Sequence, residues 1–277
     1  MWISANAKIN WSLDITGKRP DGYHLLDMLM QKTDLHDDLE ITEGSGHTLS
    51  IEGNDALASE KGNLILKAAD LLDPEGQHSA HIRLIKRIPT GAGLGGGSAD
   101  AAAALTGLNE YWKLGCSAEE LKQIGLKIGA DVPYCLTSSP ARVRGIGEDI
   151  TPFAVARCFP LVLIQPEIAL FTKEIYGYCD KCELSHPDTD ACEKALRDGE
   201  INGIARCMGN VMEAAARSSA PEIDIIKQAL SSEGAFYAGM TGSGSVVFGA
   251  FETAQEADRA CSALSGRYPV CIRANTI

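Results

Sequence analysis

A run of glycines near residue 95 is the feature of this sequence that points most plainly to chemistry. Five of the seven residues from Gly91 to Gly97 are glycine, and an alanine-rich segment follows directly. So many glycines are expected only where the backbone takes unusual dihedral angles or approaches a ligand closely. At the start of a helix, free N–H groups and the helix dipole form an anion site that suits a di- or triphosphate. A tight turn needs only one or two glycines, so the run predicts phosphate binding.

Two familiar phosphate motifs fit this run poorly. Gly91-x-Gly93-x-x-Gly96 satisfies the dinucleotide fingerprint, which also requires a buried parallel strand before it and an acidic residue about twenty residues later. Here the chain after the loop continues helically into a second helix. The P-loop requires Lys-Ser or Lys-Thr after its last glycine, and neither follows Gly97. The cation that balances a bound phosphate must therefore come from elsewhere in the chain.

A cysteine-rich segment is a second candidate for chemistry. Cys179, Cys182, His186 and Cys192 lie within fourteen residues and have the residue types of a zinc site. Compact zinc knuckles usually repeat tighter pairs, and nine cysteines without a secretory signal indicate reduced thiols instead of a disulfide framework. A polar loop with reduced thiols is the favoured interpretation, and zinc is the alternative.

The elements that position the glycine run are strands before it and helices after it. The first ninety residues indicate mostly strands and turns, with apolar and polar residues alternating over 11–16 and a loop at 17–22. Residues 81–88 fit a half-exposed strand, and the alanine-rich segment through Trp112 predicts a helix. The order is therefore strand, glycine loop, helix.

The next helix is marked at both ends. Ser117 and Glu120 form a capping box, and the helix is expected to stop at Gly129. Pro133 disfavours helical geometry in the residue before it, which places Asp131 at an element boundary.

The second half of the chain changes character. An apolar run over 161–164 precedes a long polar and helical stretch to Leu230. Residues 246–251 predict a strand, a capped helix follows from Thr253 to about Gly266, and 270–277 predicts a closing strand. This is an α+β pattern of antiparallel strands with helices.

Composition and charge exclude several function classes. The chain has 277 residues, and no stretch approaches the ~18 apolar residues of a membrane span. A net charge of -12 argues against a generic binder of nucleic acid or anionic membranes, since those need basic patches. The N-terminal segment lacks the pattern of a secretory signal, so we expect the cytoplasm.

Three segments together resemble the GHMP kinase superfamily. Residues 89–99, Pro-Thr-Gly-Ala-Gly-Leu-Gly-Gly-Gly-Ser-Ala, resemble its second motif, P-x-x-x-G-L-G-S/G-S-A, which binds ATP phosphates. Residues 5–10 resemble the first motif and residues 238–245 the third. The motifs stand in the family order and cover nearly the whole chain.

Further segments are similar to one branch of the superfamily. These are residues 19–25, Arg-Pro-Asp-Gly-Tyr-His-Leu, residues 129–133 and residues 145–148. That branch phosphorylates the 2-hydroxyl of 4-diphosphocytidyl-2-C-methyl-D-erythritol, a precursor in the non-mevalonate isoprenoid route. The closest rival is another GHMP kinase acting on homoserine or a mevalonate derivative. A regulatory ligand-binding protein on an inactive kinase scaffold is a rival of a different class.

The resemblance implies an α+β fold of two domains with the active site in the cleft between them. Residues 1–155 would form an N-terminal α/β ATP-binding domain with a left-handed crossover. Residues 156–277 would form a ferredoxin-like substrate domain. The segment 179–192 matches nothing in the family.

The resemblance also implies roles for individual residues. Asp131 would be the base that accepts the proton of the acceptor hydroxyl, although a lone Asp before Val-Pro would otherwise be read as a turn or cap residue. Lys8 would partner Asp131 and supply the positive charge that the glycine loop lacks, and Asn10 would orient the substrate from the same strand face.

A cytosine site is implied by Tyr23, His24 and Tyr176. The two tyrosine rings would stack on the base and His24 would hydrogen-bond its edge, which is a physically sensible base reader. Thr172 would contact the substrate phosphates or sugar alcohol, and Gly242 and Ser243 also belong to the expected substrate site.

The expected donor is ATP, with Mg²⁺ as the accompanying ion. Ser98 would contact Mg²⁺ or the β-phosphate, with an ordinary helix N-cap as the alternative. The partner is a small cytidine diphosphate derivative, with no nucleic acid and no membrane. The ATP-binding residues are expected to be Pro89, Thr90, Gly91, Ala92, Gly93, Leu94, Gly95, Gly96, Gly97, Ser98 and Ala99.

Overall fold

The computed structural model describes residues 1–52, 62–137, 140–168 and 170–277. Internal contacts divide the chain into two compact units. The first unit comprises residues 1–7, 35–90 and 95–138, and the second comprises residues 8–34, 91–94 and 139–277. Each unit is made of segments that alternate along the sequence, so the units do not correspond to one boundary at residue 155. The division into domains 1–155 and 156–277 remains a proposal.

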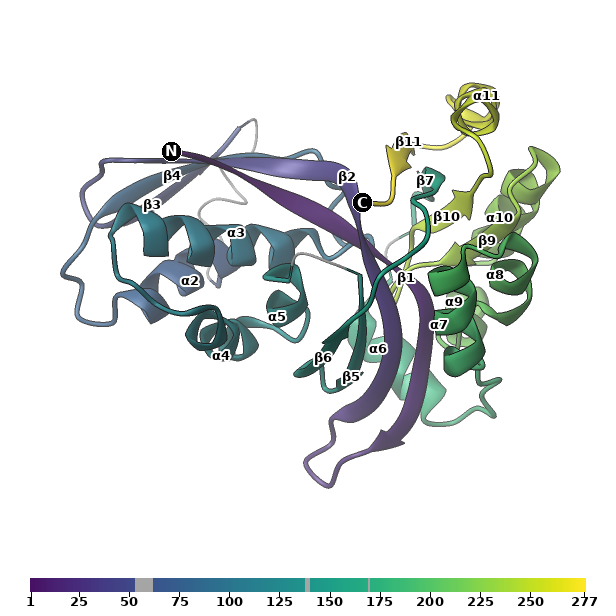
Figure 1. Ribbon diagram of the computed structural model, residues 1–277, viewed down its shortest axis with the longest axis horizontal. Coiled ribbons are helices and arrows are strands. Elements are labelled where there is room, and N and C mark those ends of the chain that lie inside the picture. The colour runs from purple at the N-terminus through teal and green to yellow at the C-terminus, as the bar shows by residue number, and fades with distance from the viewer. Residues whose placement is uncertain (53–61, 138–139, 169) are drawn as a thin grey trace. The chain divides into compact units, whose positions relative to one another are not determined.

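Two long strands supply residues to both units. β1 (Trp2–Lys18) and β2 (His24–Thr42) are joined by the loop 19–23, close to where the sequence predicted a break (Figure 1). In β1, residues 7–15 are all buried, polar ones included. The alternation of residue types over 11–16 therefore does not mark an exposed face, because both faces of this strand are covered.

The first unit contains a small sheet and a group of helices. β3 (His47–Ile51) pairs in parallel with β4 (Ala80–Ile85), and β4 pairs antiparallel with the Asp38–Thr42 part of β2. The helices are α2 (Leu64–Leu72), α3 (Gly96–Tyr111), α4 (Ala118–Ile128) and α5 (Val132–Cys135). One apolar core joins them, in which the alanines of α3 meet Leu39, Ile65 and Ile82.

The first unit confirms several expected elements and corrects two. The strand before the glycine run, the helix to Trp112 and the Ser117–Glu120 capping box are present as predicted. Helix α2 was missed, because the first ninety residues were read as strands and turns; its N-cap Asn63 accepts a hydrogen bond from the Ile65 N–H. Ser98 is the third residue of α3 and not its N-cap, which is Gly95.

The second unit is built on a four-stranded antiparallel sheet in the order β11-β7-β10-β9. The expected strands near 161–164, 246–251 and 270–277 are β7, β10 and β11, and β9 was not foreseen. Helices α10 and α11 pack on this sheet, and α11 begins with the predicted Thr253–Glu256 capping box.

The remaining strands and helices, from residue 141 onward, have the following bounds. The strands are β5 (Ala141–Gly145), β6 (Asp149–Pro152), β7 (Pro160–Gln165), β8 (Gly209–Asn210), β9 (Tyr237–Met240), β10 (Val247–Ala250) and β11 (Val270–Asn275). The helices are α6 (Thr172–Cys179), α7 (Thr189–Asp198), α8 (Ile201–Cys207), α9 (Glu213–Ser219), α10 (Glu222–Ser232) and α11 (Ala254–Leu264).

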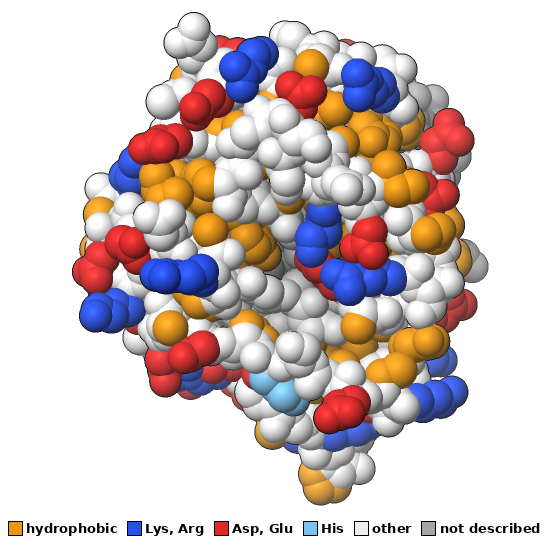
Figure 2. Space-filling model, turned by 90° about the vertical axis from the view of Figure 1, so that its right-hand side faces the viewer, with side chains coloured by type: hydrophobic (Ala, Val, Ile, Leu, Met, Phe, Trp, Pro, Cys, Tyr) orange, Lys and Arg blue, Asp and Glu red, His pale blue; other side chains and the backbone are white. Residues whose placement is uncertain are grey.

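The surface shows no single-sign patch on the face drawn in Figure 2, where acidic and basic side chains are interspersed. Within the described ranges, no helix is both long and apolar enough to cross a membrane.

Candidate active site

Three segments that are distant in sequence meet in the second unit. The Lys8 N–H on β1 donates to the Leu94 carbonyl at 3.0 Å, and the Val246 N–H donates to the Ala92 carbonyl at 3.2 Å. The Asn10 N–H donates to Thr241 Oγ1 at 3.0 Å. The first, second and third motif segments are thus held together by hydrogen bonds, two of them between backbone groups and one from a backbone N–H to a threonine hydroxyl.

Glycine makes this close approach possible. Gly93 has a φ of 76°, and a β-carbon there would collide with the Thr241 carbonyl oxygen. A β-carbon at Gly242 would lie 2.9 Å from the Gly93 carbonyl oxygen and 3.4 Å from Lys8 Nζ. At Gly93, therefore, the missing side chain serves the contact between the two turns, in addition to whatever the loop does for a ligand.

Lys8 and Asn10 form the polar centre of this site. Both side chains are buried, with Lys8 4% exposed and Asn10 2% exposed. Lys8 Nζ donates to Asn10 Oδ1 at 2.8 Å, so the two residues lie on one face of β1 as predicted from the strand period. A buried ammonium is costly unless acceptors surround it, so this lysine is not an ordinary surface residue.

Asn210 supports the site and was missed from the sequence. Its Nδ2 donates to the carbonyls of Met240 at 2.9 Å and Gly242 at 2.8 Å, while its Oδ1 accepts from the Met212 N–H. These bonds fix the turn that contains Thr241 and Gly242. The only sequence signal was one polar residue among apolar neighbours in the two-residue strand β8, which gives no periodic pattern.

The glycine loop runs into α3 in the way an anion site requires. Gly91, Gly93 and Gly95 have φ values of 64°, 76° and 69°, in the left-handed region that favours glycine. Gly95 is the N-cap of α3, with no side-chain cap and no acidic residue in the first turn. The helix N-terminus is thus left uncapped by side chains, which suits a phosphate group.

A buried charge network closes the base of this loop within the first unit. Asp37 Oδ1 accepts from the N–H groups of Arg87 and Ile88, just before the loop. Lys86 Nζ donates to Asp37 Oδ2 at 2.5 Å and to Asp100 Oδ2 at 2.9 Å, and Asp100 belongs to α3. One lysine therefore ties the strand before the loop to the helix after it.

The network also changes how its members titrate. Burial raises the pKa of Asp100 to about 7, the Asp37 carboxylate adds to the rise and Lys86 opposes it. Burial acts to lower the pKa of Lys86, but the carboxylates of Asp100 and Asp37 outweigh it and raise that pKa. Lys86 thus stays charged at neutral pH and forms ion pairs with both carboxylates.

Asp131 occupies the element boundary that the sequence predicted. It is half-buried at the N-cap position of α5, and its side chain makes no capping hydrogen bond there. The adjoining turn lies near the first turn of α3, since a β-carbon at Gly129 would be 3.9 Å from Ser98 Oγ. Asp131 belongs to the first unit and Lys8 to the second, so their pairing stays a prediction.

Two of the residues expected at the base site, His24 and Tyr176, are in contact with each other. The His24 ring stacks on Tyr176, with centroids 4.5 Å apart and an interplanar angle of 17°. His24 Nε2 lies 2.7 Å from Asp180 Oδ1, and Tyr23 is 61% exposed. Tyr176 is thus brought together with His24, whereas a sandwich of Tyr23 and Tyr176 on a base remains a prediction.

Two further expected substrate residues lie side by side. The hydroxyl oxygens of Thr172, at the start of α6, and Ser243, in the turn after β9, are 2.8 Å apart. This contact joins the α6 segment to the third motif.

The cysteine-rich segment does not form a metal centre in the described part of the chain. No group of three or more His, Cys, Asp or Glu side chains there could hold a metal ion. Cys192 Sγ donates to the Cys207 carbonyl at 2.6 Å, and His186 Nδ1 lies 2.7 Å from Asp14 Oδ1. Cys192 and His186 thus have separate partners.

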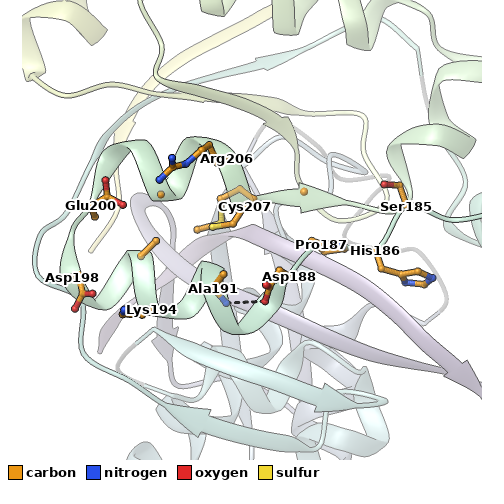
Figure 3. A pocket seen from close by; sticks show the side chains of 14 residues that line it. Ser185, His186, Pro187, Asp188, Ala191, Lys194, Asp198, Glu200, Arg206 and Cys207 are labelled. Carbon is orange, nitrogen blue, oxygen red and sulfur yellow. Dashed lines mark hydrogen bonds between the residues drawn. The ribbon is translucent and has the colours of Figure 1, made fainter.

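A pocket of about 770 Å³ lies between α7 and α8 in the second unit (Figure 3). Its lining mixes the cations Lys194 and Arg206 with the anions Asp188, Asp198 and Glu200, and the motif residues are not among its described lining. A large volume alone does not identify an active site, which also needs polar groups that converge on one point. Such a convergence is found among the three motifs, so we place the candidate active site there.

Comparison with known proteins gives two family matches. The model for the GHMP kinases N terminal domain matches residues 63–139, and the model for the GHMP kinases C terminal matches residues 192–270. A 4-diphosphocytidyl-2-C-methyl-D-erythritol kinase of Pelotomaculum thermopropionicum is 43% identical over 250 residues, which are 88% of this chain and 87% of the relative.

Solved structures agree with the sequence relatives. The crystal structure of a 4-(cytidine 5'-diphospho)-2C-methyl-D-erythritol kinase matches with a TM-score of 0.85 and 31% identity, over 100% of this chain and 99% of that chain. A homoserine kinase from Cytophaga hutchinsonii has a TM-score of 0.75 at 18% identity, over 100% of this chain and 94% of that chain. At that identity the second match shows a shared fold alone.

Proposed function

We propose, given that this chain belongs to the GHMP kinases and within them to the 4-diphosphocytidyl-2-C-methyl-D-erythritol kinases, that it phosphorylates 4-diphosphocytidyl-2-C-methyl-D-erythritol. ATP donates the γ-phosphoryl group, and the acceptor is the 2-hydroxyl of the diphosphocytidyl alcohol. The reaction is one step in the non-mevalonate route to isoprenoid precursors. The observation that supports this most strongly is the meeting of all three motif segments around Lys8 and Asn10.

The chemistry requires few protein groups. Phosphoryl transfer to an alcohol needs the hydroxyl proton removed, the donor and acceptor in line, and the phosphate charge neutralised. We assign the proton to Asp131, which lies half-buried at the start of α5. Lys8 supplies a buried positive charge, and Asn10 holds the Lys8 ammonium while it orients the acceptor.

The nucleotide phosphates are assigned to the loop 89–99 and the N-terminus of α3. The three left-handed glycines shape this backbone, and the uncapped helix start offers N–H groups to an anion. Gly242 and Ser243 adjoin the loop from the third motif, because Thr241 Oγ1 donates to the Gly93 carbonyl at 3.3 Å.

Mg²⁺ fits this site as an ion held mainly by the nucleotide. The described residues offer no cluster of acidic side chains for it, and Mg²⁺ in kinases typically keeps waters and phosphate oxygens as ligands. The Ser98 hydroxyl, in the first turn of α3, is the side chain we assign to it. When bound, the ion would neutralise charge on the transferring phosphoryl group.

The base of the acceptor is assigned to Tyr23, His24 and Tyr176, with Thr172 contacting the phosphates or the sugar alcohol. The half-buried His24–Tyr176 stack offers an aromatic surface beside a polar edge. Homoserine and mevalonate kinases of the same fold act on acceptors without a cytosine, so a cytosine site distinguishes this proposal from its rival.

We also propose a cytoplasmic location for the enzyme.

A coupled ADP-release assay tests the proposal directly. The purified chain is given ATP and Mg²⁺ with the diphosphocytidyl alcohol, homoserine or mevalonate as acceptor. We expect turnover with the first and only background rates with the other two. Faster turnover with homoserine or mevalonate would support the rival, and no ATP-dependent turnover with any of the three would support an inactive scaffold.

A further inference from the structure

We propose that Asp180 fixes the tautomer of His24 and thereby makes the base site select cytosine over uracil. This inference rests on the proposed function of His24 as the reader of the base edge. It assigns a specificity role to a residue in the cysteine-rich segment, which the motifs left without a function.

Asp180 holds His24 from a position set by helix geometry. Asp180 follows the last residue of α6, one turn after Tyr176, and its N–H donates to the Tyr176 carbonyl at 3.0 Å. Residues four apart lie on one face of a helix, so Tyr176 and Asp180 reach the same imidazole together. Tyr176 stacks on the ring face, and Asp180 Oδ1 lies 2.7 Å from Nε2 at the ring edge.

Lys18 determines what Asp180 can do. Lys18 Nζ donates to Asp180 Oδ2 at 2.6 Å from the other side of the loop 19–23. Hydrogen bonds from Lys18 and His24 lower the pKa of Asp180, so the carboxylate is ionised at neutral pH and can only accept. The hydrogen between Asp180 and His24 must therefore be carried by Nε2.

A proton fixed on Nε2 determines the hydrogen-bonding role of the other ring nitrogen, Nδ1. In a neutral imidazole one nitrogen donates and the other accepts, so Nδ1 becomes the acceptor that faces a ligand. Cytosine carries an amino donor at position 4, whereas uracil carries a carbonyl acceptor there. An Nδ1 acceptor satisfies the amino group and opposes the carbonyl, which gives selection by hydrogen-bond polarity.

The decisive substitution is Asp180→Asn. The carboxylate has one oxygen for Lys18 and one for His24, whereas an amide has a single oxygen, and Lys18 needs it because an ammonium can only donate. The amide oxygen then turns toward Lys18 and its NH₂ group faces His24, so Nε2 must accept and the proton moves to Nδ1. In the double variant Lys18→Met with Asp180→Asn, the amide oxygen is released and can again accept from Nε2. The two variants thus predict opposite polarities at the same imidazole.

The test measures binding of CDP and UDP by calorimetry, together with the ATP KM in the full-length enzyme. We expect the unaltered chain to bind CDP about tenfold or more tightly than UDP, because a polar group of the base that meets a mismatched partner loses its hydrogen bond. Asp180→Asn should remove or invert that ratio with the ATP KM unchanged, and adding Lys18→Met should restore a preference for CDP. Asp198→Asn, an exposed carboxylate on α7, is the matched control and should change nothing.

Several outcomes would overturn the inference. It is wrong if the unaltered chain does not distinguish CDP from UDP, or if Asp180→Asn keeps the ratio. It is also wrong if the double variant shows the same loss as the single one, because Asp180 would then be a structural anchor only. Turnover in the ADP-release assay separates each of these results from a failure of the proposed kinase function.

Discussion

The motif site around Lys8 and the base site around His24 are built from different kinds of contact. At the motif site the side chains are buried and the segments are joined largely by backbone hydrogen bonds. At the base site His24, Tyr176 and Asp180 meet through side chains, and the Tyr23 ring is mostly exposed. A buried backbone framework keeps reacting groups in place, whereas half-buried and exposed side chains outside that framework can be exchanged with less effect on it. The difference suggests that the chemistry resides at the first site and the choice of acceptor at the second.

The largest expected effect is that of Asp131→Asn. An amide cannot take the hydroxyl proton, and general base catalysis is typically worth ~10²–10⁴-fold in rate. Because Asn is nearly the same size as Asp and Asp131 is only half-buried, the fold and ATP binding should survive. Steady-state kinetics with a thermal melt checks this, and a fall in kcat of less than about tenfold would remove Asp131 from the chemistry.

Lys8→Met should reduce kcat nearly as much. It deletes a buried ammonium while keeping an unbranched side chain in the same space, and loss of one preorganised charge-stabilising group costs ~10²–10³-fold. The loss in kcat should exceed any rise in the ATP KM. If only the ATP KM rises, Lys8 contacts the nucleotide phosphates and is not the partner of the base.

Gly93→Ala should damage the contact between the second and third motifs. A residue with a β-carbon at this positive φ is strained by about 1–3 kcal/mol, and its methyl group would also meet the Thr241 carbonyl. We expect a lower melting temperature and a raised ATP KM.

Gly97→Ala is the matched control for that variant. Its β-carbon would meet only Leu64 Cδ1, at 3.7 Å, in a helical residue. It should keep the melting temperature of the unaltered chain. Equal melting temperatures for the Gly93 and Gly97 variants would show that the close approach does not matter for stability.

The smallest expected effect is that of Tyr176→Ala at the base site. Loss of one stacked face should cost about 1–3 kcal/mol of binding, seen as a raised KM for the diphosphocytidyl acceptor. The ATP KM and the melting temperature should hardly change, since Tyr176 is half-buried on α6. An unchanged acceptor KM would leave the chain as a GHMP kinase with its base site elsewhere.

Local patterns predicted the positions of several candidate site residues within their own helices and strands. Lys8 and Asn10 share a face because strand side chains repeat every two residues. Asp131 does lie at a boundary, but the expectation that Pro133 keeps the residue before it out of a helix was wrong, because Val132 and Pro133 form the first turn of α5, where proline is tolerated. The capping boxes at Ser117 and Thr253 were also local signals that the structure confirms.

Contacts between distant residues were beyond local patterns. Asn210 reaches the turn at Gly242 across 32 residues, and Asp180 reaches His24 across 156. Helix α2 was missed because a short apolar run among strands is ambiguous between the two periods. At the base site, the stacking of His24 on Tyr176 was likewise not visible in any local pattern, and the pairing of the two tyrosines around a ligand stays a prediction.

The most direct test of the division between the two sites is to measure kcat and both KM values for Asp131→Asn and Tyr176→Ala under the same conditions. We predict that the first variant loses kcat by ~10²-fold or more with both KM values nearly unchanged. The second should raise only the acceptor KM. If Tyr176→Ala lowers kcat as much as Asp131→Asn does, or if Asp131→Asn changes only the acceptor KM, the chemistry and the choice of acceptor are not divided between these two sites.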